Sequence, residues 1–515
     1  MGGTQGRSAV GTVFNDIGAV LAFARTVTGV TVAGMRHDEY RSFDALGLAD
    51  LVRSKQVSAA ELLDLALERA GATDHQIAAV VFIQAERARR AIAAGLPDGP
   101  FTGVPFLIKD LGCDAVDFPT CMGSRIYRDY RYAVDSELFS RIERAGLVTF
   151  ARTTSPEFGI GPTAEGAAYG RPTRNPWDLD HVAGGSSAGS AAAVASGVVP
   201  IAHGSDGGGS VRIPASSCGL FGLKPTRARL PDGPSSGEGW AGMAIDGFLT
   251  RTVRDTAALI DATHGTDIGA PYYAPPLDGT LLEAIHTAPR PLRIAYSHLS
   301  FTGDPVHPDC RAAIEHTAAL CAQLGHEMVE ADPAVDIHRF MRAWTNIVAC
   351  GTELTVRSRG VELGRSVGPD ELDGVTRGAV ALGRTISGGD YLDAVNTVHD
   401  IGRHMARFLA DERGFDMLLT STLAEPPAEI GRFQPDNDDF VDYRMGPNGV
   451  LAYSPFTALA NGTGQPAMSI PLHWNTGGLP IGTHFMARAG EEALLLQLAA
   501  QLEHADPWFD RVPPV

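Results

Sequence analysis

The sequence predicts an α/β protein with a large mixed β-sheet covered by helices on both faces. Helical and strand patterns alternate along the chain: residues 135–145 have a helical pattern that Gly146 ends, and residues 147–151 form a short apolar strand. A second helical pattern, at residues 188–196, begins directly behind a glycine-rich loop. Such alternation is typical of a sheet with a helical layer on each side.

The first regular element is a capped helix. Ser58 and Glu61 have the spacing of a capping box, and the apolar residues that follow predict a helix to about Ala70. Residues 79–83 are then predicted to form a strand.

A long, more polar region with mostly helical patterns spans residues 307–408. It separates strand patterns at residues 292–296 and 417–420. Within it, Trp344 and the apolar residues after it lie at near-helical spacing. This spacing favours a place in the core, and pocket lining is the alternative.

The composition disfavours several classes of partner. The 42 Lys and Arg against 60 Asp and Glu give a formal net charge of −18, which disfavours binding to nucleic acid or to an anionic membrane surface. The six cysteines have neither C-x-x-C spacing nor the density of a disulfide scaffold. We therefore expect a reducing, cytoplasmic location and no metal site.

Residues 1–34 differ from the rest of the chain. Residues 13–34 are apolar but include Asp16 and Arg25, which disfavours a membrane span, and the start of the chain has less positive charge than a signal peptide. We expect an N-terminal extension that is disordered or forms a short helix, with Met35 as a second candidate start of translation.

Two serine-bearing, glycine-rich loops stand out, GGSSAGS with Ser186 and SDGGGSVRIPAS with Ser210. The run Gly207-Gly208-Gly209 would weaken a helix or strand by roughly 0.5–1 kcal/mol per glycine, so it favours a tight turn or a close backbone approach. Glycine amides can point together at one oxygen, as an oxyanion requires. Ser210 is therefore the candidate nucleophile. Neither loop has the phosphate-binding pattern G-x-x-x-x-G-K-[ST], and each loop taken alone could be a plain turn.

The base for such a serine is predicted to be Lys109. The nearest histidines, His181 and His203, stand outside the glycine runs, whereas Lys109 follows the apolar run GVPFLI. A lysine at the end of a buried strand loses solvation, which lowers its pKa from about 10.4 towards neutrality and lets the amine accept a proton. A solvated lysine is the alternative for Lys109 alone, and Asp110 beside it could equally be a surface charge.

Together these motifs resemble the amidase signature hydrolases. The family pattern is a lysine after GVP or GIP, a GGSSxGS loop, and D-x-G-G-S-[IV]-R-x-P followed by CG-x-x-GLKPT. Here the three segments are GVPFLIKD, GGSSAGS and SDGGGSVRIPASSCGLFGLKPT, and the likeness extends in weaker form over residues 42–505. The resemblance implies the amidase signature fold, a large mixed twisted sheet covered by helices on both faces.

The resemblance also implies a role for each matched residue. Ser210 is the expected nucleophile, Ser186 the bridging serine that the family holds in a cis peptide, and Lys109 the base. The expected oxyanion hole consists of the backbone amides of Gly207, Gly208, Gly209 and Ser210.

Further residues are expected to support the site or to bind substrate. Ser187, Asp206 and Arg212 are expected to hold the two loops, with Asp206 and Arg212 paired or bonded to backbone amides. By resemblance, Phe158 and Ile160 lie beside the bridging serine and line an apolar substrate pocket.

The resemblance implies one large domain. We expect it to span residues 35–515, with a core at about residues 42–290 and 410–505 and a helical insertion at about residues 300–410 that shapes the substrate pocket. No cofactor is expected. The expected partner is a small-molecule amide or carbamate, with a homodimer left open.

Within the family, the sequence looks most like 6-aminohexanoate cyclic dimer hydrolases, aryl acylamidases and urethanases. This predicts hydrolysis of an amide, anilide, carbamate or ester of a neutral hydrophobic substrate. The nylon-oligomer enzymes have alanines where this chain has Gly207 and Gly208, which predicts more room beside the carbonyl. Three alternatives stay open: a nylon-oligomer hydrolase, the amidase subunit of a tRNA-dependent amidotransferase, and a catalytically silent binding protein.

Overall fold

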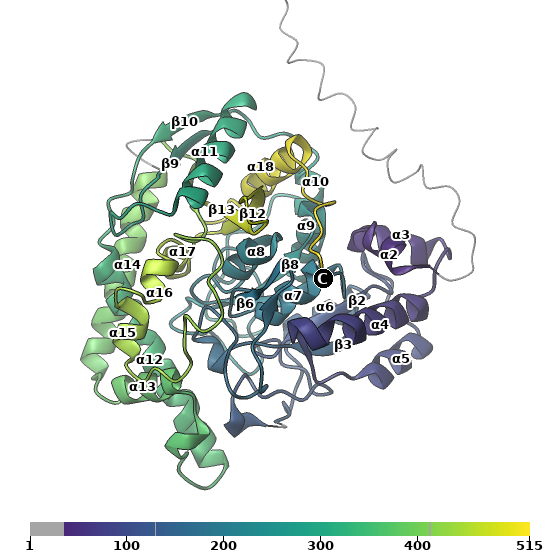
Figure 1. Ribbon diagram of the computed structural model, residues 1–515, viewed down its shortest axis with the longest axis horizontal. Helices are drawn as coiled ribbons and strands as arrows, with labels where there is room; N and C mark the ends of the chain where they lie inside the picture. The colour runs from purple at the N-terminus through teal and green to yellow at the C-terminus, as the bar shows by residue number, and fades with distance from the viewer. Residues whose placement is uncertain (1–34, 129, 411–413) are drawn as a thin grey trace, which may run out of the picture.

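An eleven-stranded mixed sheet forms the centre of the molecule (Figure 1). The computed structural model describes residues 35–128, 130–410 and 414–515, so the predicted N-terminal extension, residues 1–34, lies outside the described residues. The strands in spatial order are β1 (Val80–Val81), β3 (Val148–Thr153), β2 (Pro105–Lys109), β6 (Ile201–Asp206), β8 (Ile245–Thr250), β7 (Phe221–Lys224), β12 (Ala467–Trp474), β13 (Pro480–Ala487), β11 (Met417–Ser421), β9 (Arg293–Tyr296) and β10 (Glu327–Glu330).

Parallel pairs lie towards the two sides of this sheet and antiparallel pairs lie at its centre, while the edge strand β1 pairs antiparallel with β3. β2 pairs in parallel with β3 and β6, and β9 pairs in parallel with β10 and β11. The strands from β6 to β11 are joined by antiparallel pairs. A separate two-stranded ribbon consists of β4 (Arg174–Asn175) and β5 (Asp178–Val182).

Helices cover both faces, which confirms the predicted fold class. One face packs against α9 (Val253–Thr263) and α18 (Glu492–Ala505), beside α6 (Glu137–Arg144) and α10 (Leu281–Ala284). The other face packs against α7 (Ala188–Ala195), α8 (Arg212–Cys218) and α11 (Pro308–Gln323).

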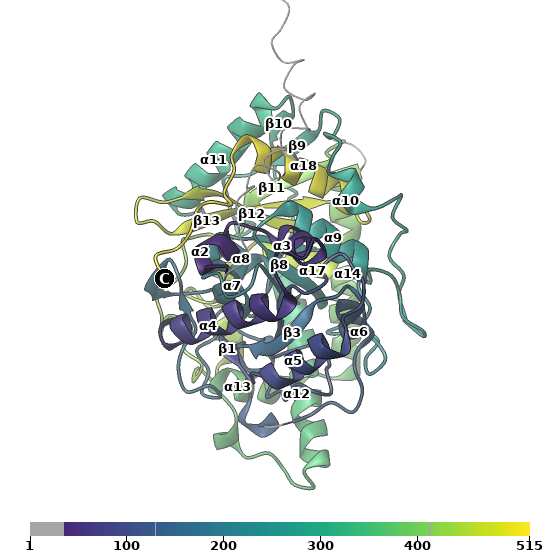
Figure 2. The same ribbon diagram turned by 90° about the vertical axis from the view of Figure 1, so that its right-hand side faces the viewer.

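Two further groups of helices flank the sheet. The N-terminal group, at the right of Figure 1 and in front in Figure 2, consists of α2 (His37–Arg41), α3 (Ala45–Arg53), α4 (Ala59–Ile77) and α5 (Ala85–Ala94). The opposite group, at the left of Figure 1, contains α12 (Ile337–Glu362), α13 (Gly374–Gly383), α14 (Gly388–Ala410) and α15 (Phe440–Met445), followed by α16 (Val450–Tyr453) and α17 (Thr457–Thr463).

Two predicted boundaries differ from the structure. The capping box of Ser58 and Glu61 is present, but α4 continues past Ala70 to Ile77, because buried positions continue at Thr73 and Ile77 on the same helical spacing. The strand predicted at residues 79–83 is only the two-residue β1.

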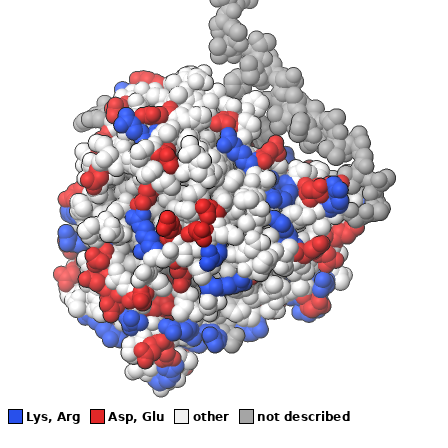
Figure 3. Space-filling model, viewed as in Figure 1, with Lys and Arg blue, Asp and Glu red and all other residues white. Residues whose placement is uncertain are grey.

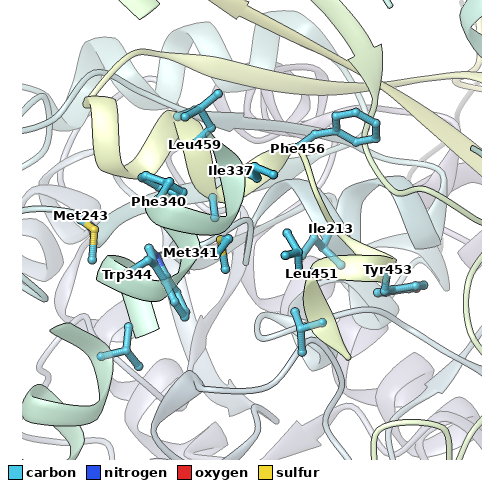
Figure 4. Close-up of a cluster of buried hydrophobic side chains, with 14 of the residues drawn as sticks. Ile213, Met243, Ile337, Phe340, Met341, Trp344, Leu451, Tyr453, Phe456 and Leu459 are labelled. Atoms are coloured by element: carbon cyan, nitrogen blue, oxygen red, sulfur yellow. The ribbon is translucent and has the colours of Figure 1, made fainter. Parts of the chain in front are cut away.

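The segment predicted as a helical insertion also contains a strand. β10 lies between α11 and α12 and pairs with β9 at the edge of the main sheet. Trp344, Ile347 and Val348 of α12 are buried in a hydrophobic cluster, as the core interpretation predicted, whereas Cys350, which the same spacing placed in the core, is only partly buried (Figure 4 labels Trp344).

Acidic and basic side chains are mixed over the face of the molecule seen in Figure 3. On this face the charges therefore do not gather into one extended positive area of the kind that binds nucleic acid.

Candidate active site

Lys109 ends β2, and the alternation of that strand sets the direction of its side chain. Phe106 and Ile108 pack into the cluster on the α9 face, and Leu107 packs into the cluster on the α7 face. Because side chains alternate along a strand, Lys109 points to the same face as Leu107. It is fully buried there, and its Nζ lies 2.6 Å from Ser186 Oγ and 2.9 Å from Ser205 Oγ.

The burial of Lys109 changes its ionisation. Burial lowers its pKa to about 7, although the negative charges of Asp246 and Asp206 act in the opposite direction. A substantial share of the amine is therefore neutral near pH 7, and a neutral amine can accept a proton from the hydroxyl beside it.

Ser186 stands directly before α7, and the Gly185–Ser186 peptide bond is cis, as the resemblance implied. The glycine before it is required by packing: a Cβ at Gly185 would lie 2.8 Å from backbone atoms of Pro162 and Thr163. The Ser186 side chain is turned towards Lys109, and both groups are buried.

Ser210 is brought to Ser186 by a backbone hydrogen bond between the two loops. The amide of Ser187 donates to the carbonyl of Ser210 at 3.2 Å. Ser187 also bonds β6, because its Oγ accepts from the amide of Ser205 at 3.3 Å. Ser210 is half-buried, whereas Lys109 and Ser186 are buried, so the candidate nucleophile is the most accessible of the three.

Asp206 stands directly before the loop Gly207–Ser210, the glycine loop, and holds its backbone in place. Its carboxylate accepts from the amide of Gly209 at 2.7 Å, from the amide of Val211 at 3.1 Å and from Arg212 Nε at 3.0 Å and Nη2 at 2.9 Å. Burial opposes its ionisation, but the charge of Arg212 and hydrogen bonds from Arg212 and Asn461 outweigh it and hold the pKa of Asp206 well below its usual range. The predicted pairing of Asp206 with Arg212 is present.

The amides of the glycine loop divide into two groups. The amide of Gly209 donates to Asp206. The amides of Gly207, Gly208 and Ser210 have no acceptor within residues 35–128, 130–410 and 414–515. Three amides of this loop are thus available to an oxygen atom bound above it.

The space beside Gly207 and Gly208 is filled. The prediction that these glycines leave more room beside the substrate carbonyl is therefore wrong. A Cβ at Gly207 would lie 2.5 Å from Cζ3 of Trp240, and a Cβ at Gly208 would lie 3.0 Å from Cζ2 of Trp344. The ring of Trp240 therefore occupies the volume of a methyl group at Gly207, and the ring of Trp344 leaves only a tight fit for one at Gly208.

The segment with Phe158 and Ile160 lies beside Ser186, as expected. A Cβ at Gly159 would lie 3.2 Å from Ser186 Oγ. Phe158 and Ile160 are buried, and the ring of Phe158 packs edge-on against Tyr127 with the centroids 5.9 Å apart. Ile160 borders a small cavity whose lining is mixed, with Val375 and Tyr443 beside the acidic residues Glu157, Glu165 and Asp373.

His203 is buried behind Lys109 and is fully engaged. Its Nδ1 accepts from the backbone amide of Lys109 at 3.2 Å, so the proton lies on Nε2, which is 3.1 Å from Asp246 Oδ1. His203 thus positions the backbone of Lys109.

Asp110 is buried, so the alternative that it is a surface charge is wrong. It is fully buried, and its carboxylate accepts from Tyr169 Oη at 2.6 Å and from Thr120 Oγ1. These bonds fix the chain directly after Lys109.

Sequence reasoning missed several residues of the site. Ser205, whose Oγ lies 2.9 Å from Lys109 Nζ, is the first residue of the SDGGGS motif. Its place in that motif could have indicated a role in the site. Asn461 donates to the carbonyl of Asp206 at 2.8 Å, and it lies within residues 42–505, where the likeness to the family is weaker. Trp240 and Thr457, which contact the glycine loop from distant segments, carried no such signal.

Comparison with known proteins decides the family. A family model described as Amidase matches residues 61–496. The chain belongs to the amidase family. It is a hydrolase that acts on C–N bonds in non-peptide amides, and the family prediction is confirmed.

Relatives match over nearly the whole chain. A 6-aminohexanoate-cyclic-dimer hydrolase from Paenarthrobacter ureafaciens is 36% identical over 478 residues, which cover 91% of this chain and 96% of that protein. A solved structure of 6-aminohexanoate cyclic dimer hydrolase superposes with a TM-score of 0.86 at 34% identity, covering 92% of this chain and 99% of that one. A bacterial aryl acylamidase gives 0.80 at 27% identity, with 90% and 96% covered.

The described residues contain neither a candidate membrane span nor a candidate metal site. In the part of the chain that the structure describes, no helix is both long and apolar enough to span a bilayer. Within the same residues, no three His, Cys, Asp or Glu side chains are placed to share a metal ion.

Proposed function

We propose that the protein hydrolyses a neutral, hydrophobic amide, anilide or carbamate through an acyl-enzyme on Ser210. The observation that carries this proposal is the position of the buried Lys109 amine, which lies 2.6 Å from Ser186 Oγ. The residue after Ser186, Ser187, donates its backbone amide to the carbonyl of Ser210 and so links the two serine loops. A base, a bridging hydroxyl and a half-buried hydroxyl thus follow one another from the interior towards the surface.

In the proposed first half-reaction, neutral Lys109 takes the proton of Ser186 Oγ as Ser186 takes the proton of Ser210 Oγ. Ser210 Oγ then attacks the substrate carbonyl carbon, and the carbonyl oxygen becomes an oxyanion. The relay returns a proton through Ser186 to the leaving nitrogen, the C–N bond breaks, and the acyl group remains on Ser210 as an ester.

In the second half-reaction, water replaces Ser210 as the nucleophile. It gives its proton to the same relay and attacks the ester carbonyl, and the acid leaves as Ser210 Oγ regains a proton. No group other than water and substrate is consumed.

The oxyanion in both steps is proposed to bind the amides of Gly207, Gly208 and Ser210. These are the loop amides without an acceptor among the described residues, whereas Gly209 is bonded to Asp206. The predicted four-amide hole is therefore proposed as a three-amide hole, with Gly209 shaping the loop.

Apolar surroundings support a neutral substrate. Phe158 and Ile160 are buried beside Ser186, where an unpaired charge would be costly. Two of the similar proteins are a 6-aminohexanoate cyclic dimer hydrolase and an aryl acylamidase. Their similarity makes a cyclic or linear 6-aminohexanoate oligomer the second candidate substrate.

A hydrolysis screen tests this proposal. The purified full chain, without ATP or tRNA, is assayed on aliphatic amides, anilides, carbamates, esters, glutamine and linear and cyclic oligoamides. We expect turnover of hydrophobic anilides or carbamates and its loss in Ser210→Ala. Turnover of glutamine alone would favour the amidotransferase alternative, and absence of turnover on every class would favour the binding-protein alternative.

A further inference from the structure

Two tryptophans from distant segments contact the proposed oxyanion loop. Trp344 lies in α12 and is 2% exposed, and Trp240 lies in the segment between β7 and β8 and is half-buried. Their rings meet edge to face, with centroids 5.8 Å apart and an interplanar angle of 78°. Neither residue belongs to the proposed proton relay.

Each tryptophan is matched to a glycine of the loop. A Cβ at Gly207 would meet Trp240 Cζ3 at 2.5 Å and Cε3 at 2.7 Å, separations that real Cβ atoms do not adopt. The other side of Trp240 needs a glycine as well, because a Cβ at Gly351 of α12 would lie 2.8 Å from Trp240 Cδ1. Trp240 is therefore held in a slot between two glycines.

Trp344 also fixes the direction of a peptide plane. Its Nε1–H donates to the carbonyl of Gly207 at 3.1 Å. In a trans peptide the carbonyl and the following N–H point in opposite directions, so this bond turns the amide of Gly208 away from Trp344. The amide of Gly208 is one of the three that lack an acceptor among the described residues.

The next peptide plane is fixed in the same way. Thr457 Oγ1 donates to the carbonyl of Gly208 at 2.6 Å, and the amide of Gly209 on the same plane donates to Asp206 at 2.7 Å. Both ends of that plane are bonded, whereas the Gly207–Gly208 plane is bonded at the carbonyl end by Trp344 and has its amide end available.

The indole of Trp344 is itself held in place. The guanidinium of Arg444 lies over the ring, 4.6 Å from its centroid, and Arg444 is buried. Trp344 and Met341 of the same helix belong to one buried hydrophobic cluster, which also contains Ile213 and Leu451 (Figure 4). A ring fixed in this way can hold the loop without rearrangement during a reaction.

We propose that Trp344 is a positioning residue for acyl transfer, which directs the amide of Gly208 at the oxyanion, and that Trp240 keeps the loop in register by filling the space beside Gly207. This inference rests on the proposed role of Ser210. It assigns the orientation of the Gly207–Gly208 peptide plane to two aromatic residues from outside the loop, whereas Asp206 and Thr457 hold the next plane.

The first experiment is Trp344→Phe, which keeps a ring of similar shape and removes the N–H donor. We expect kcat to fall by about tenfold to a hundredfold, less than the loss on removing an oxyanion donor outright. KM and the melting temperature should change little. Affinity for a boronic acid that adds to Ser210 as a tetrahedral adduct should fall by the same factor as kcat, because that adduct carries the oxyanion.

Trp508→Phe is the matched control. Trp508 is 3% exposed, and its Nε1–H donates to the carbonyl of Arg251 at 2.9 Å, away from the loop. The Trp508→Phe variant should have the kcat and the boronic acid affinity of the wild type. Equal effects of the two substitutions, or an unchanged kcat in Trp344→Phe, would overturn the inference.

The second experiment tests the fit of Trp240. Gly207→Ala should lose most of the activity and lower the melting temperature, because its methyl group overlaps the ring. The double variant Gly207→Ala with Trp240→Ala should recover both. A fully active Gly207→Ala, or a double variant no better than the single one, would contradict the size match.

The outcomes separate this inference from the proposed function. If Ser210 carries no acyl group and Ser210→Ala remains active, the proposed function fails. If Ser210 forms the acyl-enzyme while Trp344→Phe behaves as the wild type, only the inference about the tryptophans fails.

Discussion

Lys109 Nζ and Ser186 Oγ lie 2.6 Å apart although the two residues are 77 positions apart in the chain. The end of β2 supplies the amine and the turn before α7 supplies the hydroxyl, and β2 and β6 bring the two segments together in the sheet. Burial of this pair gives the amine its lowered pKa, so the same packing that builds the site also prepares its base.

The activity should depend on pH through Lys109. Burial lowers its pKa to about 7, and the amine accepts a proton only when it is neutral. We therefore expect kcat/KM to rise as pH rises through about 7 and to level off above it. A pH–rate profile on a non-ionising substrate measures this, with circular dichroism as the check on folding. A maximum at acidic pH in the folded protein would contradict the role of Lys109.

Lys109 and Ser186 should act as one relay. Each single substitution, Lys109→Ala or Ser186→Ala, should lower kcat by about 10²–10⁴-fold, the usual contribution of a positioned proton acceptor. The double variant should be little worse than either single variant, because removal of one member already stops the transfer. Losses that multiply in the double variant would indicate independent roles.

Asp206→Asn should destabilise the protein as well as inactivate it. The change leaves the buried guanidinium of Arg212 without its carboxylate, and loss of one partner of a buried pair costs about 3–5 kcal/mol. Denaturant unfolding measures the loss. Glu315→Gln, in the exposed pair of Glu315 with Arg311 on α11, is the control and should leave the unfolding midpoint unchanged.

Ile160→Trp should change substrate preference. Ile160 is buried beside the small cavity next to the Ser186 segment, so a larger ring should obstruct bulky anilides and carbamates more than small amides. The measurement is kcat/KM on a bulky and a small substrate of the same bond type. An equal loss on both would show that Ile160 does not shape the pocket.

The sequence predicted the side chains that lie within motifs and missed those that come from elsewhere. Lys109, Ser186, Ser210 and the Asp206–Arg212 pair could be predicted because each belongs to a short segment whose residue types fit one chemical task. Trp240 could not be predicted, because its contact with Gly207 depends on how the segment after β7 folds back onto the glycine loop.

The same limit explains the misjudged glycines. From the sequence, Gly207 and Gly208 indicate empty space, since they have no side chains. In the structure that space is occupied by Trp240 and Trp344, which come from segments remote in sequence. A glycine in a short sequence motif indicates that a side chain is absent, but it does not indicate which distant residue packs into the space.

The measurement that tests the central claim most directly is intact-protein mass spectrometry of the enzyme mixed rapidly with a slowly deacylating ester or carbamate. The account predicts a mass increase equal to one acyl group, located on the peptide that contains Ser210, and no increase in Ser210→Ala. Ser186→Ala should form the adduct far more slowly than the wild type. An acyl group on another residue, or normal turnover in Ser210→Ala, would contradict the assignment of Ser210 as the nucleophile.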